Sequence, residues 1–148
     1  MADFSKSFRK GLNAAKDAEE NRKEIESVFR DLNSALFQET GGKVRIEVRE
    51  FDVPYRALDL DFLKPSKTYL AIAAHNPKVK QGPVEELAKW SQDRAGYPCR
   101  IELGNMRSSC EDKAALEAQI ARLLEDPLVG KALYELAELE PDEEADGG

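Results

Sequence analysis

The stretch CRIELGNMRSSC, which runs from Cys99 to Cys110, constrains the fold more than any other part of this 148-residue chain. Apolar and polar residues alternate on both sides of Gly104-Asn105, a pattern typical of two strands joined by a two-residue turn. Glycine at the first central position favours a type II′ turn, which also sets the strand register. That register places Cys99 directly opposite Cys110. The sequence therefore predicts a β-hairpin whose two cysteines are neighbours on its apolar face.

These two cysteines are the only ones in the chain. They fall at a hydrogen-bonded position of the predicted hairpin, where Cα atoms are about 5.5 Å apart and side chains splay, so a disulfide is not favoured. We interpret Cys99 and Cys110 as buried thiols that pack as small apolar groups. The alternatives are a redox switch and a metal site, although a zinc site prefers four close ligands. We expect no metal and no cofactor.

Three further segments show strand patterns. Residues 43–51 (KVRIEVREF) and 56–63 (RALDLDFL) alternate apolar and polar side chains, as half-buried strands do. Residues 68–75 (TYLAIAAH) form a nearly continuous apolar run, which is typical of a central strand covered on both faces. We therefore predict a three-strand meander before the hairpin.

Two segments in the first two thirds of the chain have helical features. Residues 25–36 carry apolar side chains three or four apart, which predicts a helix that ends at the glycine doublet 41–42. For residues 84–94 (VEELAKWSQDR) two interpretations compete. Pro83 suits the first position of a helix and the acids that follow suit its first turn, so a helix is our prediction. A strand with Trp90 in the pleat is the alternative.

Helical spacing returns in the last third of the chain. Ser109 and Asp112 are spaced as a capping box, which predicts a helix N-terminus at this point. An apolar stripe follows until Asp126-Pro127, where a proline restarts or kinks the helix. A second stripe then begins at Leu128 and continues toward the acidic C-terminus.

Residues 1–17 form a short basic amphipathic arm. Phe4, Phe8 and Leu12 recur at four-residue spacing, and lysine and arginine side chains surround them. Such a stripe needs a surface to cover it. Two interpretations follow: the arm folds back on its own domain, or it binds a membrane or a partner.

These segments predict an α+β fold of two layers, in which an antiparallel sheet, a three-strand meander plus a hairpin, is covered by helices in the order α-β-β-β-α-β-β-α(α). We expect one domain at residues 18–140, between the arm and an acidic disordered tail at 141–148. Hydrophobic residues make up 41% of the chain and charged residues 34%, which is ordinary for a soluble globular protein. No apolar run approaches the ~20 residues of a membrane span, and no secretory signal is evident, so we expect a cytoplasmic protein.

The net charge of −7 is concentrated in the last part of the chain. From Glu111 onward, twelve acidic residues accompany only three basic ones. A cluster of this sign repels phosphate backbones, so it argues against direct nucleic-acid binding and favours a partner with a basic surface.

Few residues suggest catalysis. The single histidine, His75, follows an apolar strand without a nucleophile motif, and we interpret it as structural or solvent-exposed. Asp59 and Asp61 point to one strand face, where two carboxylates can hold a divalent ion or share a proton. Arg45 and Arg49 occupy the same face of the preceding predicted strand, so a cross-strand salt-bridge ladder is the simpler interpretation.

These observations favour a non-catalytic acidic protein-binding module, such as an inhibitor or immunity-type antagonist of a basic protein. One alternative is a dimeric secretion chaperone that binds a client, because the order of elements resembles that of small acidic chaperones of type III secretion at the level of fold alone. Another is a small enzyme that uses Asp59 and Asp61. A homodimer is compatible with either binding hypothesis. We expect partner contacts from the acidic C-terminal helices and from the arm: Glu111, Asp112, Glu117, Glu125, Asp126, Glu135, Glu138, Phe4, Phe8 and Leu12.

Overall fold

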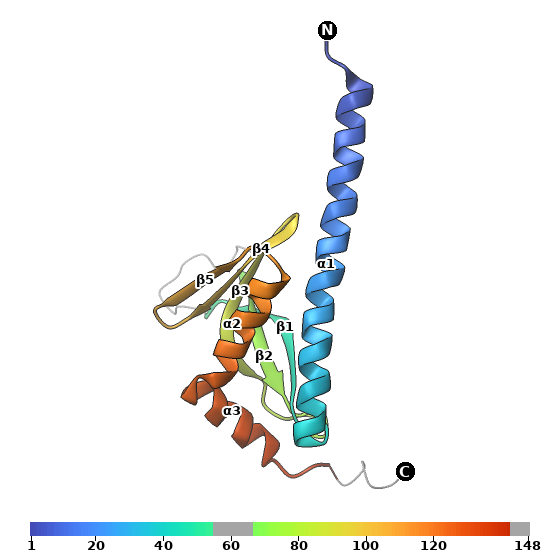
Figure 1. Ribbon diagram of the computed structural model, residues 1–148. Coiled ribbons are helices and arrows are strands. Elements are labelled where there is room, and N and C mark those ends of the chain that lie inside the picture. Colours follow the sequence, from blue (N-terminus) through green and yellow to red (C-terminus); the bar gives the residue numbers. More distant parts are fainter. Residues whose placement is uncertain (55–66, 143–148) are drawn as a thin grey trace.

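The computed structural model describes residues 1–54 and 67–142. A long N-terminal helix precedes a five-stranded antiparallel sheet in the order β1-β2-β3-β4-β5, and two short helices follow the sheet (Figure 1). The elements are α1 (Phe4–Thr40), β1 (Arg45–Asp52), β2 (Thr68–His75), β3 (Glu85–Asp93), β4 (Gly96–Leu103), β5 (Met106–Cys110), α2 (Lys113–Glu125) and α3 (Pro127–Ala137). The predicted α+β class is confirmed, and the observed order of described elements is α-β-β-β-β-β-α-α.

The predicted β4–β5 hairpin is confirmed residue by residue. Cys99 pairs with Cys110, and Leu103 pairs with Met106 beside the turn. Gly104 has a φ of 59°, and no described residue other than glycine has a positive φ. A single positive φ at the first central position agrees with a type II′ turn, so local turn chemistry sets the register of this hairpin.

The helix predicted for residues 84–94 is wrong, because this segment is strand β3. It pairs with β2 and with β4, and Trp90 lies opposite Ile101. A register shift in the β2–β3 pairing accompanies the burial of two successive residues, Leu87 and Ala88. Hydrogen bonding to strands on both sides outweighs the weak helix-start signal of a proline and two acids. The strand predicted at 56–63 lies outside the described residues.

Helix α1 is one continuous helix rather than two pieces. The Asp3 side chain accepts a hydrogen bond from the Lys6 backbone N–H at its start, and Gly41 ends it in the left-handed conformation, as its sequence predicts. Ile25 and Val28 are buried against the sheet. The part before Ala18 extends beyond the sheet, as Figure 1 shows in dark blue.

The C-terminal helices begin at aspartate caps. Strand β5 continues to Cys110, so Asp112, and not Ser109, caps α2 by accepting from the Ala115 backbone N–H. Asp126 accepts from two backbone N–H groups of α3, and Pro127 occupies its first turn, so the predicted break between the helices is confirmed.

The core lies between the helices and one face of the sheet. Its least exposed large side chains come from β1, β2, α2 and α3: Ile46, Ile72, Leu116, Leu123 and Leu136. In α3 the prediction for Leu128 is wrong, since this side chain is 76% exposed, whereas its neighbour Val129 is buried. Because α3 starts at its own cap, Asp126, its buried face does not continue the apolar stripe of α2. Val129 lies on the buried face of α3, and Leu128 lies outside it.

We expect the substitution Trp90→Ala to lower the free energy of unfolding by roughly 3 kcal/mol or more, because removal of a buried indole leaves a cavity. Trp90 is 5% exposed, and the Phe29 ring packs edge-on against it at a centroid distance of 5.6 Å. Urea denaturation followed by circular dichroism measures the change. The exposed Tyr134→Ala serves as the control, and equal losses in the two variants would contradict this packing.

Candidate binding groove

An open groove of about 890 Å³ runs between α1 and the sheet. The second half of α1 forms one wall, and β1, β2 and β3 form the floor and the other wall. The apolar lining residues are Ile25, Phe29, Phe37, Ile46, Val48, Leu70 and Trp90. Phe37 is 65% exposed and Leu70 is 42% exposed, so the groove presents large apolar side chains to solvent.

Side-chain hydrogen bonds hold the wall and floor of the groove together. The Asn33 carboxamide donates to the Ile46 carbonyl and accepts from the Ile46 N–H, each at 2.8 Å. Among the described strands β1 pairs on one side only, with β2, and the Asn33 side chain bonds the Ile46 backbone groups and so joins α1 to β1. The groove is therefore a fixed feature of the fold.

Charged groups of both signs line the polar side of the groove, among them Glu26, Arg30, Arg45 and Glu47. Burial raises the pKa of Glu47, but its hydrogen bond with Arg49 and the nearby positive charges outweigh this effect, so the pKa lies below its ordinary value. The Glu47 carboxylate is 2.7 Å from the Arg49 guanidinium and 3.7 Å from that of Arg45. Glu47 is thus a paired anion.

His75 lies beside Glu47 and Arg49. Its Nδ1 is 3.4 Å from Arg49 Nη2 and 3.9 Å from Glu47 Oε1. Since arginine only donates, Nδ1 accepts, and the ring proton belongs on Nε2. Partial burial and the Arg49 charge hold the pKa of His75 below its ordinary value of 6.5. The neutral ring is therefore a hydrogen-bond acceptor in a structural cluster.

The carboxylate pair Asp59 and Asp61 lies outside the described residues, so the predicted salt-bridge ladder with Arg45 and Arg49 stays a prediction. Within the described ranges, both arginines lie near Glu47 of their own strand. No group of three His, Cys, Asp or Glu side chains in these ranges is arranged to hold a metal ion.

We expect the free energy of unfolding to fall as the pH drops below 6.5, with a contribution from His75. Its pKa is lower in the folded chain than in the unfolded chain, so the unfolded chain binds more protons between the two values and gains population there. Urea denaturation at pH 7.5 and pH 5.5 tests this, and His75→Gln should show a smaller difference between the two pH values. The pKa of Glu47 lies below its ordinary value of 4.5, so this group titrates below the window. A His75 pKa at or above 6.5 by NMR would contradict the assignment.

Both cysteines are free and buried. The Cys99 thiol donates to the Gly96 carbonyl at 3.5 Å. Burial and the neighbouring Cys110 raise the pKa of Cys99 to about 12, and burial with the adjacent acids Glu111 and Asp112 raises the pKa of Cys110. The thiolate, the reactive form, is therefore disfavoured, which supports their interpretation as core groups.

We expect neither thiol to react with a soluble thiol reagent at pH 8 while the protein is folded, and both to react in denaturant. Timed alkylation followed by mass spectrometry measures the two rates. Rapid modification of either cysteine in the folded chain would show an accessible thiolate and revive the redox-switch alternative.

The ten predicted partner-binding residues do not form one site. The acids lie on α2 and α3 and on the residues that flank these helices, whereas Phe4, Phe8 and Leu12 lie on the projecting N-terminal part of α1 (Figure 1). Two of the acids, Asp112 and Asp126, are helix caps, and Glu117 and Glu135 each lie 3.9 Å from a lysine one turn away. Glu111, which accepts from Ser109, is exposed, as are Glu125 and Glu138.

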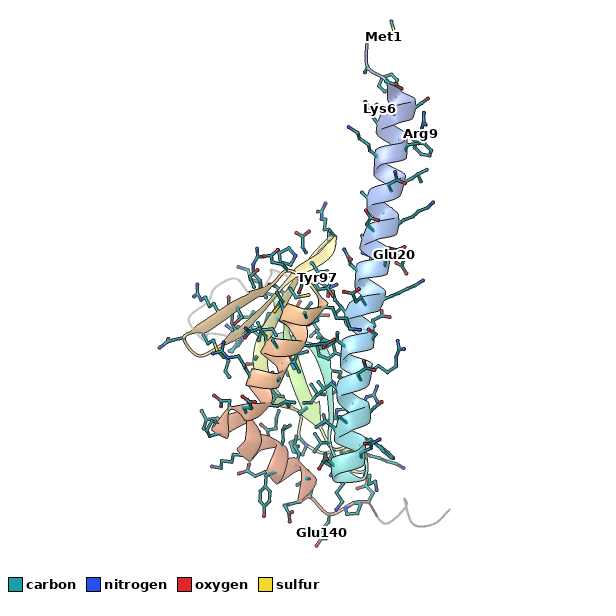
Figure 2. The ribbon with its side chains drawn as sticks, viewed as in Figure 1. Met1, Lys6, Arg9, Glu20, Tyr97 and Glu140 are labelled. Atoms are coloured by element: carbon teal, nitrogen blue, oxygen red, sulfur yellow. The ribbon has the colours of Figure 1, made fainter. Side chains whose placement is uncertain are left out.

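The arm does not fold back on the domain. Phe4, Phe8 and Leu12 are 80%, 67% and 45% exposed. Figure 2 shows Lys6 and Arg9 on the projecting part of α1, far from Glu140. The contacts with the sheet begin lower on the helix, where Asn21 Nδ2 donates to the Ala95 carbonyl.

Sequence reasoning missed the groove. Phe37 does not belong to the apolar stripe by which α1 packs on the sheet. Its position off that stripe was the one sequence signal for a second apolar surface on this helix. The role of Leu70 was not visible, because TYLAIAAH predicts a strand covered on both faces along its whole length.

Comparisons with known proteins return nothing: no protein-family model, no curated protein and no solved structure matches this chain. None of the described helices combines the length and hydropathy that a membrane span requires.

Proposed function

We propose that this chain is a non-catalytic protein-binding module that receives an apolar helical segment in the groove between α1 and the sheet. The observation that carries the proposal is the exposure of Phe37 from α1 and of Leu70 from β2 in the lining of one groove. When a partner covers apolar side chains of this size, their removal from water lowers the free energy of the complex.

The dimensions of the groove suit a helix. Its α1 wall extends from residue 25 to residue 38, which corresponds to about 20 Å at 1.5 Å per residue. A bound helix of three to four turns has this length and presents anchors at three- and four-residue spacing. Charged groups of both signs also line the groove. They can form ion pairs or hydrogen bonds with polar residues that flank the apolar anchors of a bound helix.

The polar groups nearest the groove support binding more than catalysis. The Glu47 carboxylate is ionised and paired with arginine side chains, and the neutral His75 ring accepts a hydrogen bond from Arg49. A catalytic acid or base must reach a substrate proton, whereas these two groups contact each other and Arg49. The enzyme alternative rests on Asp59 and Asp61 and stays a prediction.

Two more specific hypotheses also stay predictions. An antagonist would cover a basic partner with the acidic surface of α2 and α3, where Glu125 and Glu138 are exposed. A secretion chaperone was suggested by an order of elements with a helix at residues 84–94. Because this segment is strand β3, that comparison of element order loses its basis.

A photo-crosslinking amino acid tests the proposal in the cells that naturally produce the protein. We expect an adduct when the crosslinker replaces Phe37 in the groove, and none when it replaces Asn105 at the exposed hairpin turn. The substitution Leu70→Glu should abolish the adduct because it places a charge in the groove. The matched Leu128→Glu, at an exposed site on α3, should leave it unchanged.

A third crosslinker position, Tyr134 on α3, separates the hypotheses. Adducts from position 134 alone would overturn the groove proposal and favour the acidic-surface antagonist. The absence of any adduct from position 37 would also overturn the groove proposal.

A further inference from the structure

Helix α1 carries a second stripe, distinct from the one that packs on the sheet. From Phe4, steps of three or four residues lead along the helix to Phe37. The positions on this face are Phe4, Phe8, Leu12, Ala15, Glu19, Arg22, Glu26, Arg30, Asn33 and Phe37. Positions at this spacing lie on one face of a helix. We call this face the seam. All its positions are exposed except Asn33, which is half-buried.

The seam is apolar at Phe4, Phe8 and Leu12 and again at Phe37, and the positions between Leu12 and Phe37 are mostly charged or polar. Phe4, Phe8 and Phe37 are each at least 65% exposed. At the centre Glu19 and Arg22 form an exposed ion pair of 3.3 Å. The exposed rings of Phe4, Phe8 and Phe37 leave substantial apolar surface of this helix in water.

The order of residues along the seam is self-complementary when the helix is reversed. In an antiparallel alignment that sets Phe4 opposite Phe37, residue numbers in each pair add up to 41. Leu12 then faces Phe29, which borders the seam, and Glu19 faces Arg22. Phe8 faces Asn33, whose carboxamide is bonded to Ile46. The alignment brings two apolar pairs together at each end, Phe4 with Phe37 and Leu12 with Phe29, and opposite charges together in the middle.

We propose that a second copy of this chain occupies the groove, in an antiparallel homodimer in which the arm of each copy covers the groove of the other. This inference rests on the proposed function, since the arm is then the apolar helical segment that the groove receives. A twofold axis between residues 20 and 21 makes the interface isologous, so each copy supplies one arm and one groove.

The geometry of α1 permits this arrangement. The sheet contacts α1 from about Ala18 to its C-terminal end, and the arm projects freely beyond it (Figure 1). In the antiparallel alignment, the two sheet domains lie at opposite ends of the helix pair. The arm of one copy then runs along residues 24–40 of the other, which include the α1 wall of the groove.

The parallel alternative is disfavoured by charge and by space. A parallel pair with equal residues opposed places Glu19 against Glu19 and Arg22 against Arg22, and like charges in contact are destabilising. It also sets the two sheet domains side by side and leaves both grooves open.

The area also suits a stable dimer. Six phenylalanine side chains, Phe4, Phe8 and Phe37 from each copy, bury on the order of 1,000 Å² in total if each ring covers about 150–250 Å². Specific interfaces bury roughly 1,200–2,000 Å² in all, so the rings supply most of the required area and the rest of the helix supplies the remainder.

Sedimentation equilibrium of the full-length protein tests the proposal. We expect twice the chain mass for the native sequence and the chain mass for the double variant Phe4→Glu with Phe8→Glu. Both side chains are exposed in the single chain, so its fold should survive their replacement. The control Leu128→Glu, exposed but off the seam, should stay dimeric. A monomeric native protein, or a dimer that survives the double variant, would overturn the proposal.

A charge exchange tests the antiparallel register. Glu19→Arg alone should weaken the dimer at least tenfold, because two arginines then face each other twice across the axis. The double variant Glu19→Arg with Arg22→Glu should restore the native dissociation constant. Failure of the double variant to restore it would overturn the register, since only the antiparallel pairing sets residue 19 opposite residue 22.

The two proposals fail in different ways. A monomer in which position 37 still crosslinks to another protein overturns the homodimer alone. A native protein that yields no adduct from position 37 overturns the groove as a binding site, and with it the dimer that depends on the groove.

Discussion

The pairing of Asn33 with the backbone of Ile46 determines where α1 lies, and the rest of the architecture depends on that placement. Two hydrogen bonds of 2.8 Å join the Asn33 carboxamide to the N–H and the carbonyl of Ile46 in β1. These two bonds attach α1 to β1 through the single side chain of Asn33. With α1 held beside β1, part of the sheet face between them stays uncovered, and this part is the groove.

A second anchor determines where the arm begins. Asn21 and Arg22 donate to carbonyl groups of the β3–β4 turn, and Gly96, the first residue of β4, has a φ of 96°. A Cβ at Gly96 would lie 2.6 Å from the Asn21 Cβ, so the helix and the turn approach this closely only with glycine there. Before this contact the helix leaves the domain. Its exposed stripe is thus the consequence of a helix longer than the sheet it covers.

Much of the fold could be predicted because short-range chemistry decided it. The β4–β5 register followed from one glycine in a two-residue turn, and the break between α2 and α3 followed from Asp126-Pro127. Segment 84–94 could not be assigned in this way, since its strand conformation depends on pairing with β2 and β4. The stripe of the arm was evident in the sequence, but whether its own domain covers it was not.

The sequence by itself determined the local elements of this protein: helix caps, turn type, apolar faces and the acidic character of its C-terminal part. Each depends on residues within a few positions of one another, so composition and spacing suffice. Only the tertiary structure decided that Phe37 and Leu70, 33 positions apart, line one groove, and that the arm extends into solvent. These features depend on where α1 meets the sheet, and side-chain bonds to backbone groups elsewhere in the chain, rather than local spacing, set that position.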